Sequence, residues 1–212
     1  KLRKPILFDA KADYLLYGMA DNSVVEFAKA LDEGMSPLHV KGLSYISKEP
    51  NTEYITLPSH QECLDDKLKF MDMFDDFYHN NDPISARGLC QKVDERYLIQ
   101  NPPAPYLTTE ELDGVSALPF MRDLHPYHHK EGKVRALETI KFSISTHQGC
   151  YGECNFCAIS VHQGRTIRSR SVDSIVKEAK HFGTYKDFKG IISDLGGPTA
   201  NMYGYECSKK LT

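Results

Sequence analysis

The sequence lacks the features that mark several classes of protein. It has no run near the roughly 18 apolar residues of a membrane-spanning helix. Charged residues such as Lys4, Asp9 and Asp13 interrupt the N-terminal segment, so no signal peptide is visible. The net charge of −3 gives no general basis for nucleic-acid binding. We therefore expect a cytoplasmic protein with no membrane partner and no indicated nucleic-acid partner.

Length and composition are those of an ordinary globular chain. The 212 residues are 41% hydrophobic, which is enough for one large or two small domains without disulfide support. The chain begins at Lys1 without an initiator methionine and ends with no obvious stop to its pattern. We expect an internal fragment of a longer protein, cut at both ends.

The first segment, residues 1–47, has an α/β pattern. A short apolar run at 14–18, a helical pattern at 24–31 and a second strand pattern at 40–46 predict one βαβ unit. A single unit does not make a domain, so we interpret it as the C-terminal part of a Rossmann-like domain. No G-x-G-x-x-G motif accompanies it, and we therefore predict no dinucleotide site.

Residues 48–137 are predicted to form a helical and Pro-rich connector. Ser59 with Glu62, and Thr108 with Glu111, have the spacing of helix capping boxes. The helix after Ser59 carries an apolar stripe that we expect to be core, made of Leu64, Leu68, Met71 and Phe74. A further cluster holds His125, His128 and His129, for which a non-metal role is favoured over a metal site.

From residue 138 the α/β pattern returns. Alternating apolar and polar residues predict a strand at 140–145. Ser171 is a candidate N-cap for a helix that runs to Phe182, and an apolar run predicts a second strand at 189–194. Strand, loop, helix and strand imply a parallel crossover. Functional groups in such units lie beyond the carboxyl ends of the strands. A cysteine loop and the pair Gly196-Gly197 both fall there.

Three of the six cysteines lie within eight residues, at Cys150, Cys154 and Cys157. Without a secretory signal, this odd-numbered group argues against a disulfide framework. Three adjacent thiolates require a cation, which points to a metal or a cluster. Structural zinc would need a fourth ligand, for which His147 or His162 is available. Three cysteines on a [4Fe–4S] cluster would leave one iron open for a ligand.

The spacing C-x₃-C-x₂-C, with Phe156 before the last cysteine, resembles the cluster loop of the radical S-adenosylmethionine superfamily. Longer strings, including residues 149–159 and 196–204, resemble the YgiQ-type family of uncharacterised radical S-adenosylmethionine proteins. The resemblance covers nearly the whole chain and implies that residues 138–212 begin a partial (β/α) barrel.

The resemblance also implies a set of site residues. Cys150, Cys154 and Cys157 would hold a [4Fe–4S] cluster whose fourth iron binds S-adenosylmethionine. Contacts to S-adenosylmethionine would come from Phe156, Gly196, Gly197 and Pro198. The chain has Pro198 and Thr199 where this superfamily often has an acidic residue, so an acidic contact to the ligand is in doubt. A flavodoxin- or ferredoxin-like electron donor is expected, while the substrate and the catalytic residues stay unassigned.

Several alternatives remain open at this point. Three basic residues after the loop could hold a carboxylate or an anionic substrate, or could be surface charges or partners of a helix start: Arg165, Arg168 and Arg170. The whole region could be a structural zinc or iron–sulfur module without catalysis. Among enzymes, the second candidate is a methylthiotransferase-like RNA modifier, against which the lack of a basic patch argues. No role is assigned to Cys207.

Overall fold

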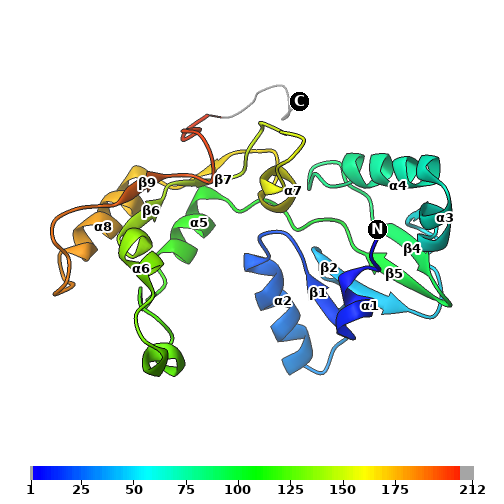
Figure 1. Ribbon diagram of the computed structural model, residues 1–212, viewed down its shortest axis with the longest axis horizontal. Helices are drawn as coiled ribbons and strands as arrows, with labels where there is room; N and C mark the ends of the chain where they lie inside the picture. Colours follow the sequence, from blue (N-terminus) through cyan, green and yellow to red (C-terminus); the bar gives the residue numbers. More distant parts are fainter. Residues whose placement is uncertain (1, 206–212) are drawn as a thin grey trace. The chain divides into compact units, whose positions relative to one another are not determined.

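A computed structural model describes residues 2–205 of the chain, so Cys207 lies outside the described residues. These residues divide into two compact units, which we describe one at a time (Figure 1). Of the described residues, the first unit contains 2–106 and 161–164, and the second contains 107–160 and 165–205. The predicted α/β class is confirmed, and the strands described form open sheets rather than a closed barrel. No helix among the described residues is long and apolar enough to cross a membrane.

The first unit contains a five-stranded mixed sheet in the order β1-β2-β5-β4-β3. Its strands are β1 (Tyr14–Leu16), β2 (Leu43–Ser47), β3 (Ile55–Leu57), β4 (Leu89–Val93) and β5 (Arg96–Gln100). Only β3 and β4 pair in parallel, and the other neighbouring strands are antiparallel. The core of the unit includes Leu43, Cys90, Val93 and Ile99, each at most 1% exposed.

The strands of the predicted Rossmann-like segment are present, but their direction differs from the prediction. β1 runs antiparallel to β2, with Tyr14 opposite Tyr45, so residues 14–47 do not form a parallel βαβ unit. Strand length and hydrophobic alternation are the same in both directions, and the sequence pattern could not separate them. β2 also pairs with β5, which lies in the predicted connector. The predicted divisions at residues 47 and 137 stay a prediction.

Helices accompany the sheet along the sequence: α1 (Ile6–Ala10), α2 (Asp21–Asp32), η1 (Pro37–His39), α3 (His60–Asp65) and α4 (Lys67–His79). The capping box at Ser59 and Glu62 is confirmed. The expectation that the apolar stripe is core is wrong, because its residues are 44–68% exposed: Leu64 on α3, and Leu68, Met71 and Phe74 on α4. Helical periodicity shows that a face is apolar, whereas burial depends on which other segment covers it.

The second unit is built on two parallel strands, β6 (Ser143–Ser145) and β9 (Asp194–Gly196). A short antiparallel pair follows, β7 (His147–Gln148) with β8 (Arg168–Ser169). Helical segments of the unit are α5 (Thr109–Ser116), η2 (Pro126–Glu131), α6 (Arg135–Ile140) and α8 (Val172–Phe182), while α7 (Ile159–Gln163) spans the division between the units. The buried side chains of this unit include Leu107, Leu112, Ile144, Ile167 and Phe182.

The predicted parallel pairing and the helix capped by Ser171 are confirmed. The strand boundaries were wrong, because Ile140 ends α6 and the second strand begins only at Asp194. Residues 135–140 include good helix formers such as Ala136, Leu137 and Glu138, and this preference outweighs the strand-like alternation that begins at Ile140. In the predicted histidine cluster, the Nδ1 of His125 accepts a hydrogen bond from the Tyr127 N–H at 3.2 Å.

Candidate metal and cofactor site

The two strand ends of the second unit lie side by side. Ser145 is in register with Gly196, and the Thr146 N–H donates to the Gly196 carbonyl at 2.7 Å. The cysteine loop begins a few residues after β6, and the Gly196-Gly197 pair ends β9. Both predicted segments therefore leave the same edge of the parallel pair, where functional groups of such units lie.

Cys150 is the innermost thiol of the cysteine loop, at 6% exposed. Its Sγ accepts a hydrogen bond from the Gly152 N–H at 3.4 Å and from the Thr199 hydroxyl at 3.5 Å. The hydroxyl comes from the segment after Gly196-Gly197, so one hydrogen bond joins the two parts of the predicted site.

Gly152 leaves a space that two thiols face. A Cβ at this position would lie 3.3 Å from the Sγ of Cys150 and 3.8 Å from the Sγ of Cys154. The Cys157 N–H donates to the Cys154 carbonyl at 2.9 Å, which places these two residues on one tight turn. Cys154 is exposed and Cys157 is half-buried. Among the described residues no three metal-ligating side chains converge closely enough to hold an ion, and Phe156 is 92% exposed.

Gly197 is a position where only glycine fits. A Cβ there would lie 2.1 Å from the Nε2 of His147, a residue that is only 2% exposed. The Nδ1 of the same ring lies 2.9 Å from the Thr146 hydroxyl. Burial lowers the pKa of His147, while the Ala200 backbone opposes the change. His147 thus packs against Gly197 at the end of β9.

Each of the three arginines after the loop has a structural partner. The Arg165 Nε lies 2.6 Å from the Oε1 of Glu153, within the cysteine loop. Arg168 donates from Nε to the Leu107 carbonyl at 2.8 Å. Arg170 donates to the Ser145 carbonyl at 2.9 Å and pairs with Glu178 at 2.5 Å. Arg165 and Arg170 are buried and Arg168 is half-buried, so the interpretation of these residues as surface charges is wrong. The interpretation as a helix-start partner is confirmed for Arg170, which donates to the hydroxyl of Ser174 in the first turn of α8 at 2.9 Å.

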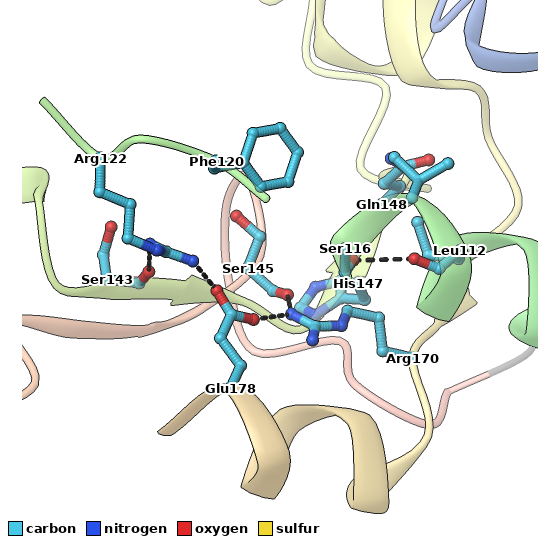
Figure 2. Close-up of a pocket in the computed structure, with 11 residues that line it drawn as sticks. Leu112, Ser116, Phe120, Arg122, Ser143, Ser145, His147, Gln148, Arg170 and Glu178 are labelled. Carbon is cyan, nitrogen blue, oxygen red and sulfur yellow. Dashed lines mark hydrogen bonds and ion pairs between the residues drawn. The ribbon is translucent and has the colours of Figure 1, made fainter. Parts of the chain in front are cut away.

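A cavity of about 330 Å³ lies along β6, and its walls include Phe120, Ser143, Ser145, His147 and Gln148 (Figure 2). Glu178 lies between Arg122 and Arg170 at this cavity and pairs with both. The two guanidinium groups donate in turn to the carbonyls of Ser143 and Ser145. Along a strand, successive residues direct their backbone groups to opposite sides. The Phe142 carbonyl accepts from the Ser193 N–H, and the Thr146 N–H donates to the Gly196 carbonyl, so these two residues at the ends of β6 face β9. The arginines therefore satisfy the edge of β6 that faces away from β9.

With this geometry in place, comparisons with known proteins bear on the interpretation. Residues 1–143 match the family described as Radical SAM N-terminal. The chain belongs to this family. It is 60% identical over 211 residues to a UPF0313 protein of Fusobacterium nucleatum subsp. nucleatum. The match covers 100% of this chain and 37% of that relative.

UPF0313 proteins of Clostridium botulinum (strain 657) and Clostridium perfringens (strain 13) are each 44% identical to the chain. These matches cover 97% and 100% of the chain and 33% of each relative. The chain thus spans about a third of the length of the curated relatives it matches. The predicted membership of the radical S-adenosylmethionine superfamily is confirmed. The cysteine loop lies beyond residues 1–143, so the roles of its residues stay predictions.

The structure of this member of the Radical SAM N-terminal family shows site residues that the sequence patterns did not identify. Thr199 was noted only for standing where an acidic residue is common, although its hydroxyl reaches Cys150. The sequence patterns assigned no role to Glu153 or Glu178. Their spacing from Arg165 and Arg170 carried no signal, because each pair is closed by tertiary structure rather than by a short-range motif.

Proposed function

We propose that this chain supplies the cofactor-binding start of a radical S-adenosylmethionine enzyme. Cys150, Cys154 and Cys157 would hold the [4Fe–4S] cluster, while Gly196, Gly197 and Pro198 would contact S-adenosylmethionine and Phe156 would lie near its adenine. The observation that carries the proposal is the hydrogen bond between Thr199 and Cys150. It brings the cysteine loop and the Gly-Gly segment together at one edge of β6 and β9, as a cluster with a bound ligand requires.

Three thiols on one loop are the donor set that such a cluster takes, although they do not converge on one point in the described part of the chain. Two of the thiols face the space beside Gly152, and the Sγ of Cys150 accepts hydrogen bonds from the Gly152 N–H and the Thr199 hydroxyl. Cys154 lies on the exposed side of the loop, from which iron and sulfide can enter. Gly196 has open space beside its backbone, where the nearest atom to a Cβ would be 3.9 Å away, so a ligand can approach it closely.

The chemistry divides between the cofactors and the chain. When bound, a reduced cluster supplies the electron that cleaves the sulfonium of S-adenosylmethionine to methionine and a 5′-deoxyadenosyl radical. The chain's own residues would hold the three irons, orient the ligand along the end of β9 and keep water from Cys150. The electron donor would be a flavodoxin- or ferredoxin-like protein, and the compartment the cytoplasm.

Anaerobic reconstitution of the complete natural protein tests this function. We expect bound iron and sulfide, absorption near about 400 nm from cysteine-ligated iron, and 5′-deoxyadenosine formed from S-adenosylmethionine under reducing conditions. Cys154→Ala should abolish all three, whereas Cys63→Ala, which removes a buried thiol of the first unit, should retain them.

The alternatives give different results in the same experiment. Tightly bound zinc without the 400 nm absorption would instead support a structural zinc module. A stable cluster that never cleaves S-adenosylmethionine would support a structural iron–sulfur module. Cleavage that the Cys154→Ala variant retains would overturn the assigned ligands.

A further inference from the structure

Glu153 has an unusual backbone conformation at the centre of the cysteine loop. Its φ of 45° lies in the left-handed region, which residues with a side chain rarely adopt. It stands between Gly152, which faces two thiols, and Cys154. A residue in such a conformation persists only where its surroundings hold it in place, and functional loops are where such residues concentrate.

Arg165 is the group that holds it. The Arg165 Nε and the Glu153 Oε1 are 2.6 Å apart, with the two side chains 10% and 33% exposed. A guanidinium buried to this degree needs an opposite charge beside it. Glu153 provides that charge from within the loop, so the pair joins the middle of the cysteine loop to the segment that returns after α7.

The returning segment also contacts the start of the loop. Gly149, with a φ of 88°, lies so close to Thr166 that a Cβ would be 2.3 Å from the Thr166 carbonyl oxygen. Ile167 beside it is 2% exposed and anchors the segment in the core of the second unit. β7 then pairs with β8 directly outside these contacts. Residues 165–167 therefore support the loop on both sides of Cys150, by packing at Gly149 and by charge at Glu153.

We propose that Glu153 and Arg165 are positioning residues, whose ion pair presets the cysteine loop for assembly and retention of the [4Fe–4S] cluster. The proposal rests on the proposed function. Neither side chain is a ligand. Their pairing fixes the backbone between Cys150 and Cys154, so that binding iron does not have to order the loop first. Partners that orient metal ligands from outside the coordination sphere act in this way.

The test measures cluster retention in the complete natural protein. After anaerobic reconstitution, the rate of iron release to a ferrous chelator is followed for Glu153→Gln, Arg165→Met and the double variant. Each should release iron about 10-fold faster than the unaltered protein. The double variant should release iron no faster than the single variants, because all three lose the same pair.

Two further variants separate the ion pair from other causes. Glu153→Gly permits a positive φ without strain but lacks the carboxylate, so it should also lose iron quickly. Asp187→Asn is the matched control, since it breaks another ion pair of 2.6 Å, between Lys141 and Asp187, away from the loop. Its release rate should equal that of the unaltered protein. Thermal unfolding of the iron-free variants shows whether each chain folds, and the electron paramagnetic resonance signal of the reduced cluster reports its geometry.

The outcomes are distinct. Iron release at the unaltered rate from Glu153→Gln and Glu153→Gly would overturn the proposal while leaving the proposed function intact. Fast release from Arg165→Met, with an unaltered rate in both Glu153 variants, would also overturn the proposal. It would show that Arg165 acts through its packing in the core and not through its ion pair with Glu153. An unaltered protein that takes up no iron would overturn both the proposed function and this inference.

Discussion

The hydroxyl of Thr199 donates a hydrogen bond to the Sγ of Cys150 at 3.5 Å, although the two residues are 49 positions apart. Cys150 belongs to the loop after β6, and Thr199 follows the Gly196-Gly197 pair that ends β9. The contact therefore places an O–H donor on one proposed iron ligand from the segment proposed to bind S-adenosylmethionine. Thr199 occupies a position near which the radical S-adenosylmethionine superfamily often has an acidic residue.

Removing that donor should change the reduction potential of the cluster. Thr199→Val keeps the shape of the side chain but deletes the hydrogen bond, which destabilises the more negatively charged, reduced form. We expect the midpoint potential to fall by tens of millivolts, because one hydrogen bond contributes about 1 kcal/mol and the couple transfers one electron. Thr199→Ser retains the hydroxyl and is the control. A potential that is equal in both variants and the unaltered protein would contradict the prediction.

A second prediction concerns the contact between Gly197 and His147. Gly197→Ala would place a Cβ 2.1 Å from the buried Nε2, so we expect lower stability and weaker binding of S-adenosylmethionine by the reconstituted protein. Gly196→Ala is the adjacent control, since its nearest neighbour would be 3.9 Å away. His147→Ala should partly restore stability to Gly197→Ala, which unfolding curves of the single and double variants would show. An additive double variant would contradict the contact.

The buried ring of His147 also predicts a dependence of stability on pH. Burial lowers the pKa of His147 below its usual value of 6.5, so the folded chain keeps the ring neutral where the unfolded chain binds a proton. The free energy of unfolding should decrease as the pH falls through 6.5, and level off below the lowered pKa. Urea unfolding at about pH 7.5 and about pH 5.5 measures this. His147→Gln should reduce the difference, and exposed His129→Gln should leave it unchanged.

Short-range signals were sufficient to predict much of the second unit. The capping residue Ser171, the parallel direction of β6 and β9, and the site at their carboxyl ends follow from local chemistry and from rules of connection. The direction of β1 and the exposure of Phe74 did not, because both depend on segments distant in sequence. The same holds for Thr199 and Glu153, whose partners are brought near by the fold alone.

Asn101 is expected to be important for the stability of the first unit. At 2% exposed, its side-chain amide donates to the carbonyls of Leu38 and Val40 at 2.8 Å, and its Oδ1 accepts from the Tyr54 hydroxyl at 3.0 Å. Asn101→Ala leaves these groups without their partner and should lower the free energy of unfolding by about 2–4 kcal/mol. Asn51→Ala removes only one exposed turn contact, and in urea unfolding should cost less than about 1 kcal/mol.

The last prediction compares a buried and a more exposed carboxylate of the second unit. Glu178 pairs with both Arg122 and Arg170, and its side chain is 12% exposed. Glu178→Gln leaves the buried Arg170 and the half-buried Arg122 without this counter-charge, so we expect the free energy of unfolding to fall by about 3–5 kcal/mol. Asp187 pairs with Lys141 but is 57% exposed, and water screens its charge. Asp187→Asn should therefore leave the free energy of unfolding almost unchanged. Because the arginines also hold the free carbonyls of β6, amide hydrogen exchange in residues 143–146 should rise in Glu178→Gln and not in Asp187→Asn. Equal losses of stability in the two variants would show that Glu178 does not organise this edge.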